Sequence, residues 1–534
     1  MINSIELQNV RLFRDRTLFN LPGLCVLCGT NNSGKSSVLR SILMLRQSQG
    51  IQEPAQRRQG VLRFVGLQAD LGQYSTFVSD CKIQEDISIS VKVPVYLPES
   101  DIKLFHLLRQ DSAKNELIPP DRPLPSSGPL FLKIDFKFKG HQAKSNMPEA
   151  EVQGLLETAK YSIIDKSGVI FAWDVTYSED EILMSESSGF VQPSVGMAQT
   201  EEAMYVLTVP SRYFEEVGGK RLMQPFSEDE HNLRLIVVLD GLLPTKIVAK
   251  FLLKKGKPAD DWSIFPLPPA IDRLTDQFKA ALSAIHYIAP LRAPAKRFYI
   301  TQYDALPNLD PTGEFLPYLF ARQREPEVVH VLPKQTTPIK QGLYAALDAW
   351  MHYLRTGEFK PEPLPFREVI VSSLRGVLVE LQIPTPQGTG THSLADSGFG
   401  YSQVLPILVR GLLSSERSTI IIEQPELHLN PALQVRLAEF FVALVLAGKQ
   451  VILETHSEHI VNTIRVLIAE QDLPQLTGNS NIYYLECSPT GPLLHDLAIR
   501  SDGSVPDWPR EFFGEAAELV ARLLRAQKRH KVSD

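Results

Sequence analysis

The sequence predicts an α/β fold with a mostly parallel sheet and an inserted β-rich region. The last third of the chain alternates short, β-branched runs with longer helical patterns, and the runs are 419–423, 450–454 and 481–485. Continuous apolar strands separated by helices are typical of a parallel sheet with helices on its faces. The middle of the chain differs, because residues 86–230 hold β-type runs separated by polar and proline-rich spacers such as 118–129.

The two ends of the chain are expected to build one domain around this insertion. The N-terminal residues read as two strands, a glycine loop and a helix that places Val38 and Ile42 on one side. The 534 residues are too many for one ordinary folding unit. The expected segments are an N-terminal lobe (1–85), a β-rich and helical insertion (86–285, with helical spacing from Ile271 to Ile285), a C-terminal part of the first domain (286–500) and a helical tail (501–534).

Composition narrows the class of protein. No apolar run is long enough to span a membrane, and the first residues lack a secretory signal, so we expect a cytoplasmic protein. Of four cysteines, Cys25 and Cys28 lie in an apolar strand-like run, which favours buried core positions over a metal or redox pair. The net charge of −6 gives no support for a globally basic nucleic-acid binder. The basic stretches 254–257 and 522–531 leave a local nucleic-acid contact open.

The strongest functional motif is the glycine-rich loop GTNNSGKS, which matches G-x-x-x-x-G-K-[ST] in full. It stands between a strand and an amphipathic helix, where backbone N–H groups and the helix N-terminus favour phosphate. Lys35 can reach the β- and γ-phosphates, and the Ser36 hydroxyl can ligate Mg²⁺. The predicted nucleotide-binding residues here are Gly29, Asn31, Asn32, Ser33, Gly34, Lys35, Ser36 and Ser37.

A second motif, TIIIEQPELHLNP, places an acid at the end of a buried strand. Glu423 at the carboxyl end of such a strand, beside a phosphate-binding loop, can hold Mg²⁺ through water. Asn430 and Pro431 then open a helix as N-cap and first-turn proline.

Two further motifs place candidate nucleotide-contacting residues at a helix start and at a strand end. In LADSGFGYSQVLPIL, the turn with Ser397, Gly398 and Gly400 precedes a helical pattern and predicts a second anion site. In VILETHSEHI, His456 stands at the carboxyl end of the next strand, where it can contact a γ-phosphate or an attacking water. A helix-capping role is the alternative for His456.

In this order the motifs resemble the ABC-type ATPase head of the SMC/RecF/OLD class: P-loop, signature, Walker B acid and switch histidine. The stretches YIAPLRAPAKRFY, DSGFGYSQVLPIL, EQPELHLNP, ETHSEHI and DGSVPDWPREFF are similar to stand-alone prokaryotic ATPases, many of them from antiphage-defence operons, such as the ATPase subunit of Septu-type systems. The resemblance covers the first 80 residues and about 286–515. It implies a P-loop ABC-type ATPase head with a mostly parallel sheet and an inserted β-rich region.

The resemblance also implies ligands and partners. ATP and Mg²⁺ are the expected cofactors, with Ser36 and Glu423 on the metal. A head-to-tail homodimer would close two composite sites, each signature covering the other chain's γ-phosphate. Gln73 is the expected Q-loop residue, ahead of Gln68, and Arg292 is a phosphate, interface or salt-bridge residue. The residues after Ile499 are too few for the Toprim domain of OLD-class nucleases. We therefore expect a separate effector, such as an HNH-type nuclease.

Gln424 is the main departure from the pattern of these ATPases. Most of them carry glutamate after the Mg²⁺-binding acid, where it polarises the attacking water. Glutamine has the same shape but cannot take a proton at neutral pH, so we expect slow hydrolysis that depends on Glu423, Gln424 and His456. A natural glutamine and a substituted one both fit the sequence. Two alternative functions stay open: a nuclease with an unrecognised metal site in the insertion, and a DNA-repair-type ATPase.

Overall fold

The computed structural model describes residues 1–49, 59–66, 69–102, 129–142, 152–166, 168–178, 204–208, 233–252, 258–300, 310–314, 316–321, 325–360, 367–374, 378–385, 390–397, 399–471, 476–488, 491–506, 508–509 and 522–523. The chain forms two compact units. The first comprises Met1–Asn20 and Ser37–Ile285, and the second Leu21–Ser36 and His286–Asp534. These units group the chain differently from the four expected segments, because the P-loop strand and residues 1–20 belong to different sheets.

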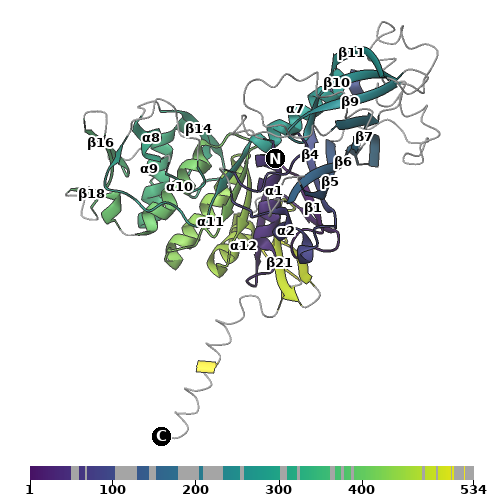
Figure 1. The fold of residues 1–534 in the computed structure, drawn as a ribbon. Coiled ribbons are helices and arrows are strands. Elements are labelled where there is room, and N and C mark those ends of the chain that lie inside the picture. The colour runs from purple at the N-terminus through teal and green to yellow at the C-terminus, as the bar shows by residue number, and fades with distance from the viewer. Residues whose placement is uncertain are drawn as a thin grey trace. The chain divides into compact units, whose positions relative to one another are not determined.

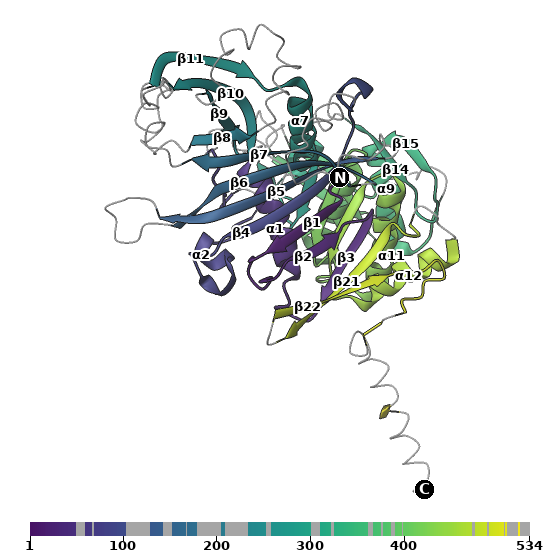
Figure 2. The same ribbon diagram turned by 90° about the vertical axis from the view of Figure 1, so that its right-hand side faces the viewer.

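The first unit is built on a ten-stranded antiparallel sheet, which Figure 2 shows as a row from β2 to β11. Its order is β11-β10-β9-β8-β7-β6-β5-β4-β1-β2. The strands are β1 (Ser4–Gln8), β2 (Thr17–Asn20), β4 (Ile87–Val95), β5 (Leu130–Gln142), β6 (Val152–Asp165), β7 (Gly168–Ser178), β8 (Met204–Thr208), β9 (Leu233–Asp240), β10 (Leu243–Leu252) and β11 (Pro258–Pro266). The β-rich character expected for the middle of the chain is confirmed.

Apolar side chains at alternating positions give this sheet one buried face. In β4, Ile87, Ile89, Val91 and Val93 are buried at every second position, as a sheet with one covered face requires. Helix α7 (Pro269–Ser283) supplies cover, and the Phe278 ring lies 6.2 Å from that of Phe136. Helix α1 (Lys35–Ser48) contributes Arg46, which donates to the carbonyl of Leu282. The predicted helical spacing is confirmed from Ile271 to Leu282, whereas Ile285 lies beyond the helix and begins strand β12.

The second unit holds a six-stranded sheet in the order β12-β19-β20-β3-β21-β22. The strands are β3 (Leu24–Gly29), β12 (Ile285–Ile288), β19 (Thr419–Glu423), β20 (Gln450–Glu454), β21 (Ser480–Ser488) and β22 (Gly491–Ala498). β19, β20, β3 and β21 are parallel neighbours, and β22 is antiparallel. Every residue of β19 and β20 is buried, which is why these strands read as continuous apolar runs.

Helices and small strands surround this sheet. The helices are α8 (Leu316–Ala321), α9 (Leu343–Thr356), α10 (Phe399–Leu413), α11 (Pro431–Leu446) and α12 (Glu458–Gln471). The small strands are β13 (Tyr299–Ile300), β14 (Glu327–Val331), β15 (Pro338–Gly342), β16 (Ile370–Leu374), β17 (Leu378–Pro384) and β18 (Thr391–Ser393). Helices α9, α10 and α11 contact one another (Figure 1). The Trp350 ring lies 4.9 Å from that of Phe440 in their core.

Local signals read from the sequence hold in this unit. The Asn430 side chain accepts a hydrogen bond from the Leu433 N–H, and Pro431 is the first residue of α11, as predicted. Cys25 and Cys28 are free and fully buried in β3, which confirms their assignment to the core. Because β19, β20 and β3 are parallel neighbours, their carboxyl ends lie at the same edge of the sheet.

Candidate functional site

The P-loop follows β3 in a backbone path that needs glycine. Gly29 has a φ of +131°, and a Cβ there would lie 1.9 Å from the carbonyl oxygen of Leu485. The Thr30 N–H donates to that same carbonyl over 3.1 Å, so the loop begins against β21. Asn32 and Gly34 also have left-handed backbones, with φ of 58° and 99°. Left-handed residues between ordinary ones turn successive N–H groups inward, which produces a cradle for an anion.

Lys35 opens helix α1 beneath this cradle. Its ammonium group donates to the carbonyls of Thr30 and Gly29, over 2.6 and 3.2 Å. The side chain is only 4% exposed, and burial lowers the Lys35 pKa while the charge of Glu454 opposes that change. Ser33 donates from its hydroxyl to the Thr30 carbonyl over 2.8 Å. A buried cation at a helix N-terminus, under a loop of inward N–H groups, fits the phosphates of a nucleotide.

The exposure of the remaining P-loop residues divides them into two groups. Asn31 and Asn32 are exposed at the outside of the loop, whereas Ser33 and Gly34 are buried. Ser37 is 5% exposed and its carbonyl accepts from the Ser41 hydroxyl, within α1. The predicted phosphate cradle is thus backed by buried residues on its helix side.

Ser36 contacts a carboxylate that the sequence reasoning did not select. Its hydroxyl donates to Oε1 of Glu454 over 2.9 Å. Glu454 ends β20, is 3% exposed, and stands in register with Glu423 at the end of the neighbouring β19. Oε1 of Glu423 accepts from the Tyr287 hydroxyl over 2.9 Å. The strand edge therefore presents two buried acids, and the same signal that selected Glu423, an acid ending a buried strand, also marks Glu454.

The turn after β19 is held from two sides. Gln424 has a φ of 44°, a left-handed conformation that is uncommon for a residue with a side chain. Its N–H donates to the Glu454 carbonyl over 2.7 Å. Arg292 donates to the carbonyls of Glu423 and Gln424 over 3.0 and 3.4 Å. Burial lowers the pKa of Arg292 to about 10, although Glu426 and Tyr287 oppose that change. Arg292 thus supports the main chain of this turn.

Glu426 joins this turn to the loop that carries His456. Its two carboxylate oxygens accept from the Thr455 hydroxyl over 2.8 Å and from the His456 N–H over 2.6 Å. The chain turns after Glu423, so the Glu426 side chain leaves the line of the strand. Burial raises the pKa of Glu426, while these hydrogen bonds lower it. A half-buried carboxylate with two donors fixes the loop geometry on which the position of His456 depends.

The His456 side chain is exposed beside this loop. Partial burial and the positive charge of Lys35 lower the pKa of His456, which favours its neutral imidazole form. The capping alternative belongs to its neighbour, because the Ser457 hydroxyl accepts from the Ile460 N–H at the start of α12. A neutral imidazole can donate or accept a hydrogen bond, which suits contact with a phosphate or a water.

The signature turn lies at the start of α10. The Ser397 hydroxyl donates to the Leu394 carbonyl over 2.6 Å. A Cβ on Gly400 would lie 3.7 Å from Leu429 and 3.8 Å from the His428 carbonyl oxygen. Gly398 lies outside the described residues. Within the part of the chain that the structure covers, no hydrogen bond joins this turn to the P-loop.

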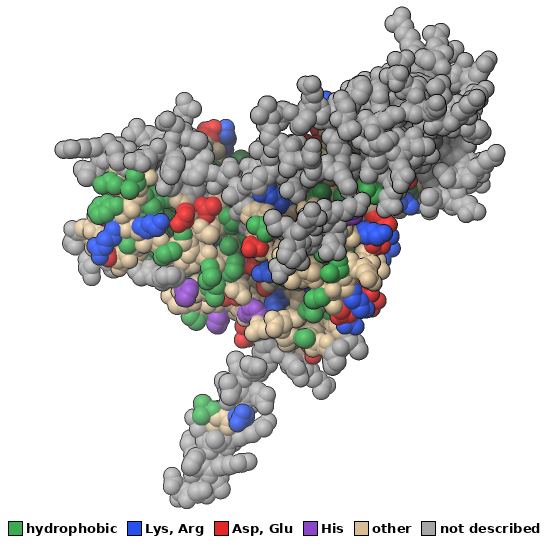
Figure 3. Space-filling model, in the orientation of Figure 1, with side chains coloured by type: hydrophobic (Ala, Val, Ile, Leu, Met, Phe, Trp, Pro, Cys, Tyr) green, Lys and Arg blue, Asp and Glu red, His purple; other side chains and the backbone are tan. Residues whose placement is uncertain are grey.

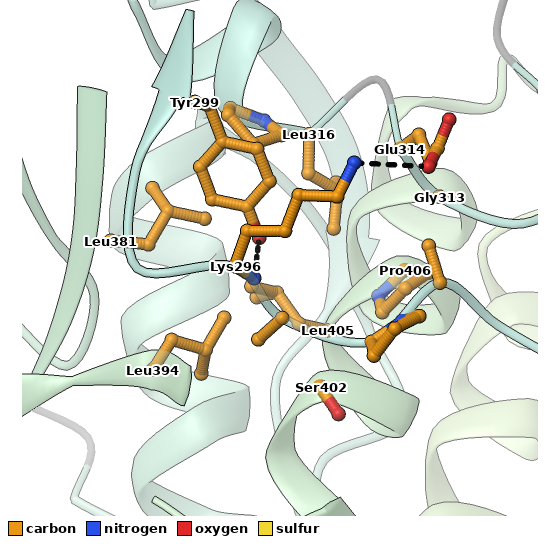
Figure 4. Close-up of a pocket in the computed structure, with 14 residues that line it drawn as sticks. Lys296, Tyr299, Gly313, Glu314, Leu316, Leu381, Leu394, Ser402, Leu405 and Pro406 are labelled. Atoms are coloured by element: carbon orange, nitrogen blue, oxygen red, sulfur yellow. Dashed lines mark hydrogen bonds and ion pairs between the residues drawn. The ribbon is translucent and has the colours of Figure 1, made fainter. Parts of the chain in front are cut away.

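The segment from Arg292 to Arg297 lies between the turn after β19 and the signature turn. Arg292 holds the turn after β19, and Arg297 pairs with Asp396, just before the signature, over 2.8 Å. Between them Lys296 lines a hollow, where its ammonium group pairs with Glu314 and its N–H donates to the Tyr299 hydroxyl (Figure 4). The opposite wall comes from α10, through Ser402, Leu405 and Pro406. The segment therefore contacts the turn after β19 through Arg292 and the residues just before α10 through Arg297.

The predicted Q-loop residue belongs to the first unit. Gln73 is exposed and precedes the short helix α2 (Tyr74–Phe77), where its N–H donates to the Thr76 hydroxyl over 3.1 Å. Gln68 lies outside the described residues. The role of Gln73 toward a nucleotide stays a prediction.

Other expected features fall on parts of the chain that are not described. These are the basic stretch 254–257, nearly all of the spacer 118–129, and most of the C-terminal tail. Across the described residues, no group of three or more His, Cys, Asp or Glu side chains is placed to hold a metal ion. None of the helices that the structure describes is long and apolar enough to cross a membrane. On the face shown in Figure 3, described acidic and basic side chains lie interspersed.

Comparison with known proteins identifies the family. The family model described as AAA ATPase domain matches residues 1–174 and 364–461, which is more than half of the chain. The chain belongs to the AAA ATPase domain family. The match includes the P-loop, Glu423, Gln424 and His456. The predicted P-loop α/β ATPase fold and ATPase activity are thereby confirmed.

Solved structures with a similar fold are remote in sequence. One is an SmcHead bound to the C-winged helix domain of ScpA, with 9% identity, a TM-score of 0.36, and coverage of 93% of this chain and 98% of that one. Another is the SMC head domain from Thermotoga maritima, with 8% identity, a TM-score of 0.31, and coverage of 93% and 99%. A third is an Smc head domain with an extended coiled coil, bound to the C-terminal domain of ScpA derived from Pyrococcus furiosus, with 9% identity, a TM-score of 0.35, and coverage of 98% and 99%. No curated protein matches the sequence at a significant level.

The Glu426 contacts lead to a prediction. Glu426→Ala should lower ATP turnover by about tenfold, because two hydrogen bonds to a charged group are lost, and leave ATP affinity nearly unchanged. Glu426→Gln, which keeps one acceptor oxygen, should recover part of the loss. Steady-state ATPase assays and fluorescent-nucleotide titrations measure both quantities. Glu458→Ala, in the first turn of α12, is the matched control. Equal turnover in Glu426→Ala and wild type would contradict a role for this carboxylate in positioning His456.

Proposed function

We propose that this ATPase is a slow, ATP-operated dimeric switch that regulates a separate effector. The observation that carries the proposal is the pairing of a complete P-loop and two strand-end acids with Gln424 directly after Glu423. The parts that bind and orient are present, while the position of the general base holds an amide. Such a site suits prolonged occupancy by nucleotide better than rapid turnover.

The residues assigned to binding fit ATP and Mg²⁺. The inward N–H groups of the loop and the Lys35 ammonium would hold the β- and γ-phosphates. The Ser36 hydroxyl and Glu423 would hold Mg²⁺, whose charge stabilises the developing negative charge of phosphoryl transfer. Gln424 would orient the attacking water through its amide oxygen, and neutral His456 would donate to the γ-phosphate side. Each of these roles is carried by side chains that the second unit contains.

The dimer part of the proposal rests on the signature turn. Among its described residues, Ser397 donates to Leu394, and a Cβ on Gly400 would meet His428, Leu429 and Leu433, none of them in the P-loop. We infer that a second copy of the chain supplies the signature to each nucleotide, in a head-to-tail homodimer. Nucleotide would then control the association of two heads, and slow hydrolysis would set how long they stay closed.

The effector part rests on the motif resemblance to stand-alone antiphage-defence ATPases. We propose a separate nuclease, such as one of the HNH type, as the effector, with antiphage defence as the setting. The insertion and the C-terminal tail lie apart in sequence from the nucleotide motifs and are the proposed contact regions. A chain without residues 510–534 should keep ATP binding but co-purify less of its effector, and unchanged co-purification would place the interface elsewhere.

Lys35→Ala tests the nucleotide site directly. Loss of charged hydrogen bonds worth about 1.5–3 kcal/mol should weaken ATP binding by roughly ten- to a hundredfold. Isothermal titration calorimetry with a slowly hydrolysed ATP analogue measures the change, and Lys82→Ala, on the surface of the other unit, serves as control. Equal affinities for Lys35→Ala and wild type would overturn the assignment of the site.

A further inference from the structure

We propose that Glu454 is a positioning residue for Mg²⁺, which acts by fixing the Ser36 hydroxyl. This inference rests on the proposed nucleotide site and assigns it a second acid beside Glu423. The P-loop pattern requires only a serine or threonine at position 36, and the acid expected to accompany it ends β19. In this chain the hydroxyl instead donates to the acid at the end of β20, over 2.9 Å.

Strand order explains why Glu454 reaches Ser36. β20 lies between β19 and the P-loop strand β3, so its carboxyl end is the nearer of the two to the P-loop. Glu454 is in register with Leu27, two residues before the loop begins at Gly29. Its side chain is 3% exposed, and its charge raises the pKa of Lys35 against the effect of burial. One carboxylate thus contacts the hydroxyl and balances the ammonium group of adjacent P-loop residues.

The hydrogen bond from Ser36 to Glu454 orients the hydroxyl oxygen as a metal ligand. A serine hydroxyl has one proton to donate and two lone pairs to offer. When the proton is committed to Glu454, the rotation of the hydroxyl is fixed and its lone pairs face away from the carboxylate. A fixed lone pair is what a metal ligand needs, and Mg²⁺ demands near-ideal octahedral geometry. Partners that orient metal ligands in this way typically change metal affinity by about 10- to 100-fold when removed.

The sheet itself does not depend on this side chain. The main chain of Glu454 pairs within the parallel ladder, and its carbonyl accepts from the Gln424 N–H over 2.7 Å. These contacts survive any substitution of the side chain. A buried carboxylate on a strand that is otherwise apolar is costly unless paired, and here it accepts a hydrogen bond from the P-loop serine.

A double-mutant cycle tests the proposal. The variants are Glu454→Ala, Ser36→Ala and the double variant, with Glu454→Gln as the shape-conserving form. ATP affinity is measured with a fluorescent analogue, first in EDTA and then across a Mg²⁺ titration, and Mn²⁺ binding is followed by electron paramagnetic resonance. Glu486→Ala is the matched control, because this acid pairs with His495 and belongs to strand β21, which lies on the other side of β3 from β20.

Glu454→Ala should raise by about tenfold or more the Mg²⁺ concentration at which the gain in ATP affinity is half-maximal. The ATP affinity measured in EDTA should be unchanged or higher. The double variant should lose little beyond Ser36→Ala, because Glu454 acts through that hydroxyl. An unchanged Mg²⁺ requirement in both Glu454 variants would overturn the proposal. So would a double variant whose loss of Mg²⁺ affinity equals the product of the two single losses. These outcomes are separate from failure of the nucleotide site itself, which would appear as wild-type ATP affinity in Lys35→Ala.

Discussion

Replacing Gln424 by glutamate should raise steady-state ATP turnover by roughly a hundredfold, within the 10²–10⁴ range typical of general-base assistance. A glutamine can hold and orient water through its amide oxygen, but it cannot take the proton that the attacking water must lose. Glutamate has the same length and shape and supplies that basic group. Wild-type turnover should accordingly lie well below the median enzyme rate of about 10 s⁻¹.

The backbone at position 424 makes this substitution a clean test. The Gln424 N–H is held by the Glu454 carbonyl, and its own carbonyl is held by Arg292. On the Gln424 side, both contacts use main-chain atoms, so a glutamate should project from the same place. The φ of 44° is a strained conformation for either side chain, and the exchange does not change that strain.

A steady-state ATPase assay with and without Mg²⁺ measures the effect. Glu423→Gln is the companion variant and should remove Mg²⁺-dependent hydrolysis in either background, because it eliminates a metal-binding charge while keeping the shape. Two results count against the slow switch: wild-type turnover of tens per second, or no response to Gln424→Glu.

Local features of this fold could be read from the sequence because their causes are local. The P-loop requires glycine where its backbone is left-handed, Asn430 and Pro431 carry the signal for the start of α11, and continuous apolar runs mark buried parallel strands. Each of these depends on residues close together in the chain. The same holds for α7, whose apolar spacing matched its buried face.

Long-range pairing could not be read in this way. Ser36 and Glu454 are 418 positions apart, and their hydrogen bond depends on β20 lying beside β3. β1 joins the β-rich sheet through β4, with Ile5 opposite Val91, although the intervening residues include the P-loop strand of the other sheet. Glu426 turns toward Thr455 because the strand ends at Glu423. Such contacts follow from strand order, which the pattern of apolar residues leaves open.

Gly400→Glu should leave ATP binding intact and lower turnover by roughly 10²–10³, the loss typical when a group that stabilises transition-state charge is removed. Gly400 lies in the first turn of α10, where helix N–H groups favour an anion. A carboxylate at this place repels the γ-phosphate that a second chain would present. Gly400→Ala is the matched control, because a Cβ there meets Leu429 at an ordinary 3.7 Å.

Light scattering with a slowly hydrolysed ATP analogue should show dimers for wild type and Gly400→Ala, and monomers for Gly400→Glu. A wild-type chain that stays monomeric under these conditions would contradict the composite site. Dimers of Gly400→Glu with normal turnover would contradict the role of the signature.

Mixing two inactive variants decides whether each site is shared between chains. Lys35→Ala lacks a working P-loop but keeps its signature, and Gly400→Glu has the opposite defect. In a head-to-tail dimer of one copy of each, one site combines the intact P-loop with the intact signature. A one-to-one mixture should then recover up to about half of wild-type turnover, since Gly400→Glu does not pair with itself and each mixed dimer has one intact site of two. If one chain supplied both elements to its own nucleotide, both variants would be defective in every site, and the mixture would stay inactive.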